Sequence, residues 1–286
     1  MNTPHRFLIV DGYPEKSREE LKAAGVGFAY ELYAKMLRKY LPEAEYDVLL
    51  PADEKTPIPQ GKGLERYAGI LWTGSNLRIL DRHIPTVRVQ IDLAKAAYQI
   101  GIPSFGSCWG LQIAVVAAGG FVGKNPKGRQ MGIARKIVLT EKGKRHPMYA
   151  GKPKVFDAFA SHEDIVLKTA EGSAILAGNE FVPIQALSVT HGKGTFWSVQ
   201  YHPEFGLKEM ACLINARAER LMEIGYFRQS KEVTQMVERM KRLHDEPDRK
   251  DLRWQLAVDE DLLSANIRQC EFRNWIRTFF PTKERA

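Results

Sequence analysis

The sequence predicts an α/β fold: an open, mostly parallel sheet flanked by helices, with an α-helical C-terminal extension. Three observations lead to this class. Short apolar runs alternate with longer segments of helical periodicity in the first half of the chain, further β-rich runs follow up to residue 205, and only helical patterns occur from residue 206 on. Alternating strands and helices are typical of parallel sheets covered by helices on both faces.

The individual elements follow from this pattern in chain order. Short apolar runs predict buried strands at 7–10, 46–50, 69–72 and 102–105. Apolar residues at helical spacing predict helices between these strands, at 19–40 and 86–100. Further β-rich runs predict the strands that complete the sheet, at 132–139, 154–160, 183–189 and 195–201.

The segment after residue 205 predicts a second unit. We divide the chain into a domain at 1–205 and a helical extension at 206–286. Helical periodicity in the extension covers 207–227, 232–244 and 261–280, with a polar break at 245–251. Large apolar side chains there would be poorly soluble if exposed, so we expect them to pack on the first domain or at an oligomer interface: Trp254, Phe272, Trp275, Ile276 and Phe279. A structural cap is the simplest role for this extension.

Composition limits the class of protein. Of 286 residues, 44% are hydrophobic, which is enough for a large core, and no apolar run approaches the length of a membrane span. The apolar run near the N-terminus is too short for a signal peptide. The three cysteines are widely spaced and show no metal-ligand pattern, which favours a reducing compartment. We therefore expect a cytoplasmic protein with no cofactor, no metal and no membrane partner.

The net charge of +8 has a local origin, because residues 121–154 contain ten Lys or Arg and a single acidic residue, Glu141. Such stretches are usually solvated, and no nucleic-acid-reading motif accompanies this one, so no nucleic-acid partner is expected. The segment GGFVGKN at 119–125 has the wrong glycine spacing for a P-loop, and GVGFAY at 25–30 lacks the third glycine of a dinucleotide fingerprint. The sequence therefore predicts no nucleotide site.

One cysteine stands between two glycines where a predicted strand meets a predicted helix. In the segment GSCWG, Cys108 follows the strand at 102–105 and precedes an alanine-rich helical pattern. A G-x-nucleophile-x-G turn holds a reactive side chain at the end of a strand, and its glycines allow the backbone to approach closely. The N-terminus of the next helix favours a thiolate. This pattern favours a nucleophile over an ordinary core cysteine.

A thiolate nucleophile normally works with a histidine that a third group orients. His202 follows the predicted strand at 195–201, and Glu204 comes two residues later. Pro203 between them favours an extended backbone, which projects both side chains to the same side. We interpret Cys108, His202 and Glu204 as a catalytic triad. His162 is the rival base, but no predicted strand directs it towards the same end of the sheet.

Taken in order, the motifs resemble the class I glutamine amidotransferases, especially the glutaminase domain of GMP synthase and its free-standing relatives. The matching segments between residues 6 and 205 are FLIVDGYP, GILWTGSN, GSCWGLQ, KGRQMG, SHEDIV and VQYHPEF. The resemblance implies a flavodoxin-like sheet. It also implies hydrolysis of the glutamine side-chain amide through a γ-glutamyl thioester on Cys108, with ammonia released for a separate acceptor or synthetase.

The resemblance implies roles for further residues. His202 would transfer protons, and Glu204 would orient its ring. The backbone N–H groups of Gly74 and Trp109 would form the oxyanion hole. The substrate would be bound by Gln112, Ser161 and His162.

The chain departs from the family pattern at three positions around the implied pocket. Thr73 stands where a glycine is usual, Ser75 where a proline is frequent, and Glu163 where a glycine is common. The substrate therefore stays open between free glutamine and a larger γ-glutamyl compound. Three functions remain in view: a glutamine amidotransferase, a γ-glutamyl peptidase or transferase, and a non-enzymatic regulatory or interaction module. A docking synthetase and a homodimer are the protein partners considered.

Overall fold

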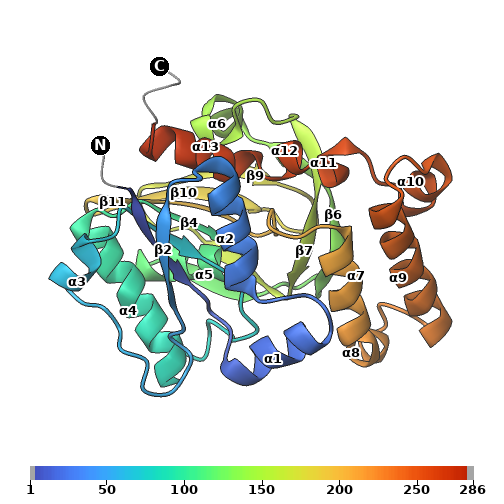
Figure 1. Cartoon of the computed structure of the whole chain (residues 1–286), viewed down its shortest axis with the longest axis horizontal. Coiled ribbons are helices and arrows are strands. Elements are labelled where there is room, and N and C mark those ends of the chain that lie inside the picture. The colour runs from blue at the N-terminus through green and yellow to red at the C-terminus, as the bar shows by residue number, and fades with distance from the viewer. Residues whose placement is uncertain (1–3, 282–286) are drawn as a thin grey trace.

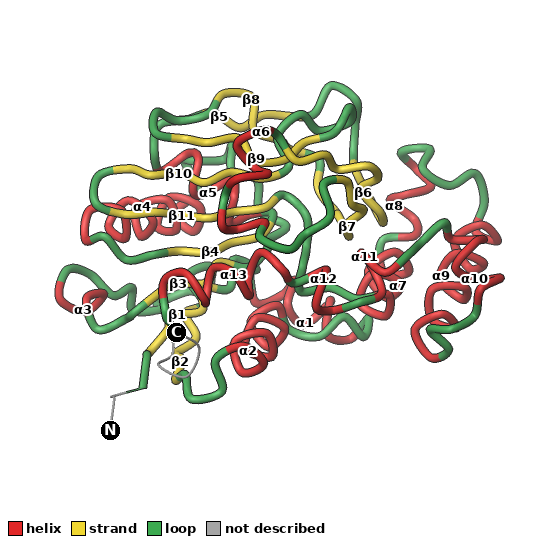
Figure 2. The backbone as a smooth tube through the Cα atoms, turned by 90° about the horizontal axis from the view of Figure 1, so that it is seen from above, coloured by secondary structure: helices red, strands yellow, loops and turns green. Residues whose placement is uncertain are grey.

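The computed structural model describes residues 4–281, and its centre is a nine-stranded sheet in the order β2-β1-β3-β4-β11-β10-β9-β6-β7. Figure 2 shows much of this order, with β10, β11, β4, β3, β1 and β2 following one another down the view. Five of the nine strands run parallel: β2 (Glu45–Leu49), β1 (Arg6–Val10), β3 (Gly69–Trp72), β4 (Ser104–Ser107) and β11 (Gly194–Val199). The predicted fold class is confirmed.

The other four strands of this sheet extend it through antiparallel pairs. They are β10 (Ala186–His191), β9 (Ser173–Gly178), β6 (Gln130–Leu139) and β7 (Val155–His162). A separate two-stranded sheet pairs β5 (Phe121–Lys124) with β8 (Asp164–Lys168). The segment between β7 and β8 therefore turns sharply, since the two strands belong to different sheets.

Helices cover both faces of the parallel strands. Side chains alternate along β1, so that Leu8 and Val10 pack with α4 (Pro85–Ile100) and α5 (Trp109–Ala117). Phe7 and Ile9 point to the other face, where α2 (Ala29–Tyr40) and α13 (Cys270–Phe279) lie. Strands buried on both faces explain the continuous apolar runs in the sequence.

The predicted helix at 19–40 is in fact two helices. α1 (Glu15–Ala23) ends before two glycines with left-handed backbone, Gly25 at φ 86° and Gly27 at φ 84°, and α2 begins after them. Glycine adopts such φ values without steric cost, so these positions end one helix and redirect the chain. The remaining short helices of the first part are α3 (Lys62–Glu65), α6 (Glu141–Arg145) and a 3₁₀ turn (Pro147–Tyr149).

The chain from residue 206 on is helical as predicted, and most of it lies at one end of the sheet (Figure 1). Its elements are α7 (Leu207–Ala216), α8 (Ala218–Glu223), α9 (Ser230–Asp245), α10 (Lys250–Leu256), α11 (Glu260–Leu263), α12 (Ala265–Arg268) and α13. Of the expected packing residues, Phe272, Trp275 and Ile276 are buried against the sheet. Trp254 is 85% exposed and does not pack on the first domain.

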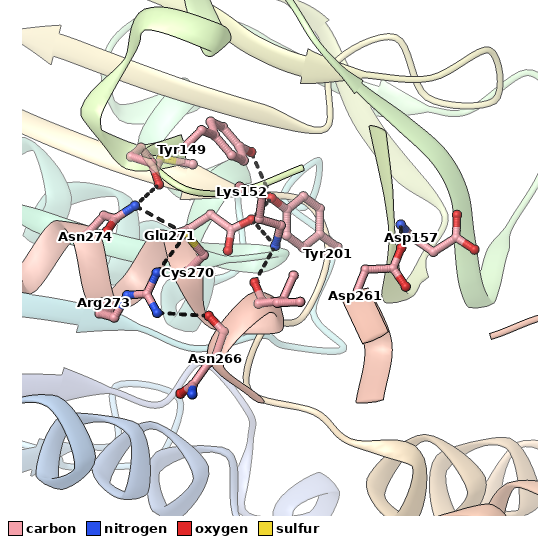
Figure 3. A network of polar contacts seen from close by, with 12 residues as sticks. Tyr149, Lys152, Asp157, Tyr201, Asp261, Asn266, Cys270, Glu271, Arg273 and Asn274 are labelled. Carbon is pink, nitrogen blue, oxygen red and sulfur yellow. Dashed lines mark hydrogen bonds and ion pairs between the residues drawn. The ribbon is translucent and has the colours of Figure 1, made fainter. Parts of the chain in front are cut away.

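A buried polar network fastens α13 to the sheet (Figure 3). Lys152 Nζ lies 2.7 Å from Glu271 Oε1, and both side chains are almost completely buried. The Tyr201 hydroxyl donates to the same carboxylate at 2.5 Å, and Asn274 Nδ2 donates to the carbonyl of Ala150 at 2.9 Å. Because Tyr201 directly precedes His202, this network connects the last helix to the segment that carries the predicted base.

Candidate active site

Cys108 occupies a strained turn between β4 and α5. Its φ is 52° and its ψ −96°, a conformation that non-glycine residues rarely adopt. Its backbone N–H donates to the carbonyl of Val199 at 2.7 Å. A Cβ on Gly106 would lie 2.9 Å from the Cα of Gly110, and one on Gly110 would lie 2.9 Å from the Trp72 carbonyl oxygen. The two glycines are therefore required by close backbone packing, as predicted.

Three parallel strands bring the predicted site residues to one edge of the sheet. Ser107 at the end of β4 pairs with Val199 at the end of β11, and Gly106 pairs with Trp72 at the end of β3. Gly74, Cys108 and His202 follow these strand ends and so gather at the same edge. Ligand sites of parallel α/β sheets lie outside the carboxyl ends of the strands.

His202 and Glu204 form a buried pair. Nδ1 of His202 lies 2.7 Å from Oε1 of Glu204, and this oxygen also accepts a hydrogen bond from Ser107 Oγ at 2.9 Å. The Tyr33 hydroxyl donates to Ser107 Oγ at 2.7 Å. The imidazole stacks on the ring of Phe205, with centroids 4.3 Å apart and an angle of 8°. The ring is therefore held in one orientation from its edge and from its face.

The charges around His202 change its proton affinity. Burial by itself lowers the pKa of the imidazole, but the Glu204 carboxylate and Cys108 outweigh burial and raise this pKa to about 10. His202 is consequently an imidazolium at neutral pH.

Of the predicted oxyanion residues, Gly74 lies beside His202, and Trp109 directly follows Cys108. A Cβ on Gly74 would be 3.1 Å from Cε1 of His202, so the backbone at residue 74 passes close to the imidazole. Trp109 is the first residue of α5, where backbone N–H groups have no partner within the helix. Thr73 Oγ1 accepts from the N–H of Gly12 at 3.1 Å, which ties the Gly74 loop to the end of β1.

The predicted substrate-binding residues lie around the junction of β7 and β8: Ser161 and His162 end β7, and Gln112 is in α5. The carbonyl of Ser161 lies 3.9 Å from Cys108 Sγ. Gln112 Nε2 donates to the carbonyl of Asp164 at 3.2 Å, and His162 Nδ1 lies 3.2 Å from the same oxygen. All three predicted residues thus surround one loop that faces the thiol.

The expectation that no strand directs His162 to this site is wrong, because His162 is the last residue of β7. Its electrostatic environment nevertheless differs from that of His202. Its Nε2 lies 3.0 Å from Oε1 of Gln130, and burial together with the charge of His202 lowers the pKa of His162 to about 3. The ring is neutral at physiological pH and is fixed by uncharged oxygens. This arrangement suits a positioning role and does not suit a base.

Sequence reasoning missed several residues of this site. Ser107 is adjacent to Cys108 in sequence, but its partner Glu204 is 97 positions away. Arg217, at the end of α7, donates to Ser161 Oγ at 2.6 Å, although its segment was interpreted only as a cap. Arg129 belongs to the quoted motif KGRQMG, and its charge interacts with that of Cys108. Only the folded chain brings these residues to the thiol.

Two further findings concern other kinds of site. In residues 4–281, no three His, Cys, Asp or Glu side chains are grouped to hold a metal ion. Within the same range, every helix is too short or too polar to cross a bilayer.

Comparison with known proteins identifies the family. The sequence profile of Glutamine amidotransferase class-I matches residues 30–217. A Pseudomonas protein named gamma-glutamyl-L-1-hydroxyisopropylamide hydrolase is 36% identical over 226 residues, which cover 78% of this chain and 75% of that protein. The glutamine-hydrolyzing GMP synthase of Thermosipho africanus is 34% identical over 169 residues, which cover 59% of this chain and 30% of the synthase.

Solved structures share the fold. A glutamine amidotransferase from Thermotoga maritima superposes with a TM-score of 0.66 at 16% identity, over 98% of this chain and 100% of that chain. One from Methylobacillus flagellatus superposes with a TM-score of 0.59 at 15% identity, over 97% and 94% of the two chains. With the sequence profile spanning more than half of its length, this chain belongs to the class-I glutamine amidotransferase family.

Proposed function

We propose that this protein hydrolyses the γ-amide of a γ-glutamyl compound through a thioester on Cys108. The observation that carries the proposal is the positive φ of Cys108 at the start of α5, at the sheet edge where the His202–Glu204 pair also lies. This geometry would hold a sulfur atom at the carboxyl ends of the parallel strands, beside a proton donor whose orientation is fixed. In this proposal residues 1–205 carry the chemistry and residues 206–286 complete the site wall.

The proposed reaction has two halves. The Cys108 thiolate attacks the amide carbon, the C–N bond breaks, and the His202 imidazolium gives its proton to the leaving nitrogen. His202, now neutral, takes a proton from the water that attacks the thioester, and glutamate leaves as the thiolate–imidazolium pair is restored. The N–H groups of Gly74 and Trp109 would stabilise both tetrahedral intermediates. Each N–H group would contribute about 3–4 kcal/mol.

Two substrates fit this chemistry. Free glutamine would release ammonia for a separate synthetase. An N-substituted γ-glutamyl amide would release an amine, and one observation favours it: the similarity to the Pseudomonas hydrolase extends over 78% of this chain, against 59% for the GMP synthase. Thr73, Ser75 and Glu163 around the pocket support the same choice, because they differ from the usual family residues.

The proposal is tested by measuring ammonia release from glutamine and amine release from γ-glutamyl amides with purified protein. We expect turnover of at least one of them, covalent labelling of Cys108 by a glutamine-like diazo-ketone, and loss of both in Cys108→Ala. Cys212→Ala, which changes another buried cysteine, is the matched control and should keep both properties. Turnover that survives Cys108→Ala, or a folded wild type that neither turns over nor is labelled, would overturn the proposal.

A further inference from the structure

A large basic cavity adjoins the candidate active site. Its volume is about 1100 Å³, and its walls come from β5, the β5–β6 loop, β6, Glu163, the β9–β10 loop and the α8 region. The cationic side chains in the walls are Lys124, Lys127, Arg129, Arg135, Lys136 and Arg220. Glu163 and Glu180 are the carboxylates, so six positive charges face two negative ones, a difference of +4. Such a cavity is far larger than released ammonia needs.

Several of these cations already have partners. Arg135 Nη1 lies 2.6 Å from Asp157, and Lys124 Nζ lies 3.0 Å from Glu163. Arg220 pairs with Glu223 at 3.1 Å, but both side chains are exposed to water, which weakens that pair. Of the other three cations, Lys127 and Lys136 are exposed to water, whereas Arg129 is partly buried.

Arg129 lacks full compensation for its charge. Its nearest carboxylate oxygen, on Glu163, is 4.0 Å away and belongs to a group already paired with Lys124. Its Nε is buried and has no hydrogen-bond acceptor among the described residues. Burial and the charge of Arg217 lower the pKa of the Arg129 guanidinium, while Cys108 and Glu163 oppose that shift. A bound anion would remove this deficit.

The same residues connect the cavity to the thiol. Glu163 lines the cavity and comes two positions after Ser161, whose carbonyl lies 3.9 Å from Cys108 Sγ. Arg217 donates to the neutral Ser161 hydroxyl and has no ion pair within residues 4–281. Two arginines thus lie near the reaction centre, and the carboxylate nearest to Arg129, on Glu163, is already paired with Lys124. The α-carboxylate of a γ-glutamyl group carries one negative charge, so binding it would leave one of the two arginine charges uncompensated.

We propose that this cavity receives the leaving amine of a γ-glutamyl amide and that this amine carries a carboxylate, as in a γ-linked amino acid or peptide. This inference rests on the proposed function. The bond broken is the γ-amide C–N bond, the nitrogen takes the His202 proton, and the amine departs with its carboxylate against Arg129. The Pseudomonas relative is named for an amine part that bears a hydroxyl group, so the two proteins would differ in leaving group.

The test compares two substrates with the same glutamyl half and leaving amines of similar size, γ-glutamyl-β-alanine and γ-glutamyl-n-propylamide. For the wild type we expect kcat/KM to be about tenfold or more higher for the β-alanine compound, the scale of one charge-assisted hydrogen bond. Arg129→Gln and the exposed-wall variant Arg220→Gln should each reduce this preference, because they lower kcat/KM for the β-alanine compound more than for the propylamide. Arg129→Lys should retain part of it.

Arg242→Gln removes an equivalent charge from the exposed surface of α9 and should leave the preference unchanged. A wild type without the preference, or a preference that survives both Arg129→Gln and Arg220→Gln, overturns the inference. Equal losses on both substrates in Arg129→Gln also overturn it, because they assign the arginine to the glutamyl half. Turnover of the propylamide or of glutamine in any of these cases leaves the proposed function standing, whereas failure on every substrate removes both.

Discussion

At the scale of single residues, the site depends on a strained cysteine and a charged histidine. A non-glycine residue in a sparsely populated backbone region costs on the order of 1–3 kcal/mol, so the surrounding packing must hold Cys108 at φ 52°. Gly106, Gly110 and the hydrogen bond to Val199 provide that packing. The strain persists because relaxing it would disrupt three neighbouring strands.

Replacing Cys108 separates stability from activity. Cys108→Gly should be inactive, yet about 1 kcal/mol more stable than Cys108→Ala, because relief of the backbone strain exceeds the extra entropy of glycine in the unfolded chain. Denaturant unfolding of the two variants measures the difference. A Cys108→Gly protein that is less stable than Cys108→Ala would show that the turn is not strained.

The pH profile tests the charge on His202. Its pKa of about 10 predicts that kcat/KM stays high through neutral pH and falls about tenfold per pH unit above about 10, as the proton donor is lost. Glu204 raises this pKa, so Glu204→Gln should move the alkaline limb to lower pH. Glu171→Gln, an exposed control, should not move it. An alkaline limb unchanged by Glu204→Gln would contradict the assigned pair.

At the scale of elements, the last helix is fastened by buried polar groups as well as by aromatic packing. Phe272 and Trp275 of α13 contact Phe105 of β4 with ring centroids 5.3 and 6.0 Å apart. Glu271, which pairs with Lys152, directly precedes Phe272 in the same helix. Replacing one member of a buried ion pair by an uncharged residue is costly, because the charge of the other member stays buried without a partner or water.

Removing one member of this pair should be strongly destabilising. Lys152→Met leaves the Glu271 carboxylate buried beside Tyr201 and should lower the free energy of unfolding by about 3–5 kcal/mol. Adding Glu271→Gln should recover part of the loss, since no uncompensated charge remains. Urea titration gives both values, and Lys154→Met at an exposed neighbour is the control. A double variant as unstable as the two losses added together would exclude coupling between the groups.

At the scale of the whole molecule, three clusters of buried apolar side chains pack against one sheet. One lies between the sheet and α4 and α5, a second between the sheet and α2 and α13, and a third among α7, α9, α10 and strands β6 and β7. The second cluster contains Phe272, Trp275 and Ile276 from the end of the chain. The first domain therefore depends on the extension to cover one face of its sheet.

A chain ending at residue 205 should consequently fail to fold cooperatively. It would expose the face of β1 and β4 that Trp275 and Phe272 cover, including Phe7 and Phe105. We expect aggregation or a broad unfolding transition measured by circular dichroism, with the full chain as reference. A soluble 1–205 protein with a sharp transition would show that the extension is dispensable for the fold.

Local pattern was enough to predict the parallel half of the sheet, the turn at Cys108 and the contact between the His202 and Glu204 side chains. These features are encoded by neighbours in the chain: apolar runs, flanking glycines, and a proline between two side chains. Strands β5, β8 and β9 were not predicted, because they are short and only partly apolar. In addition, β5 pairs with β8 across the intervening β6 and β7. Short-range periodicity carries no information on such pairing.

The charge state and surroundings of the site were decided by tertiary structure alone. The hydrogen bond from Ser107 to Glu204, the approach of Arg217 to Ser161 and the uncompensated Arg129 each join segments that are far apart in sequence. Electrostatic interaction depends on distance and burial, which only the folded chain defines. Local sequence pattern therefore predicts the fold class and the candidate reactive residues. Their proton affinities and the basic cavity beside them depend on distances and burial that arise only in the folded chain.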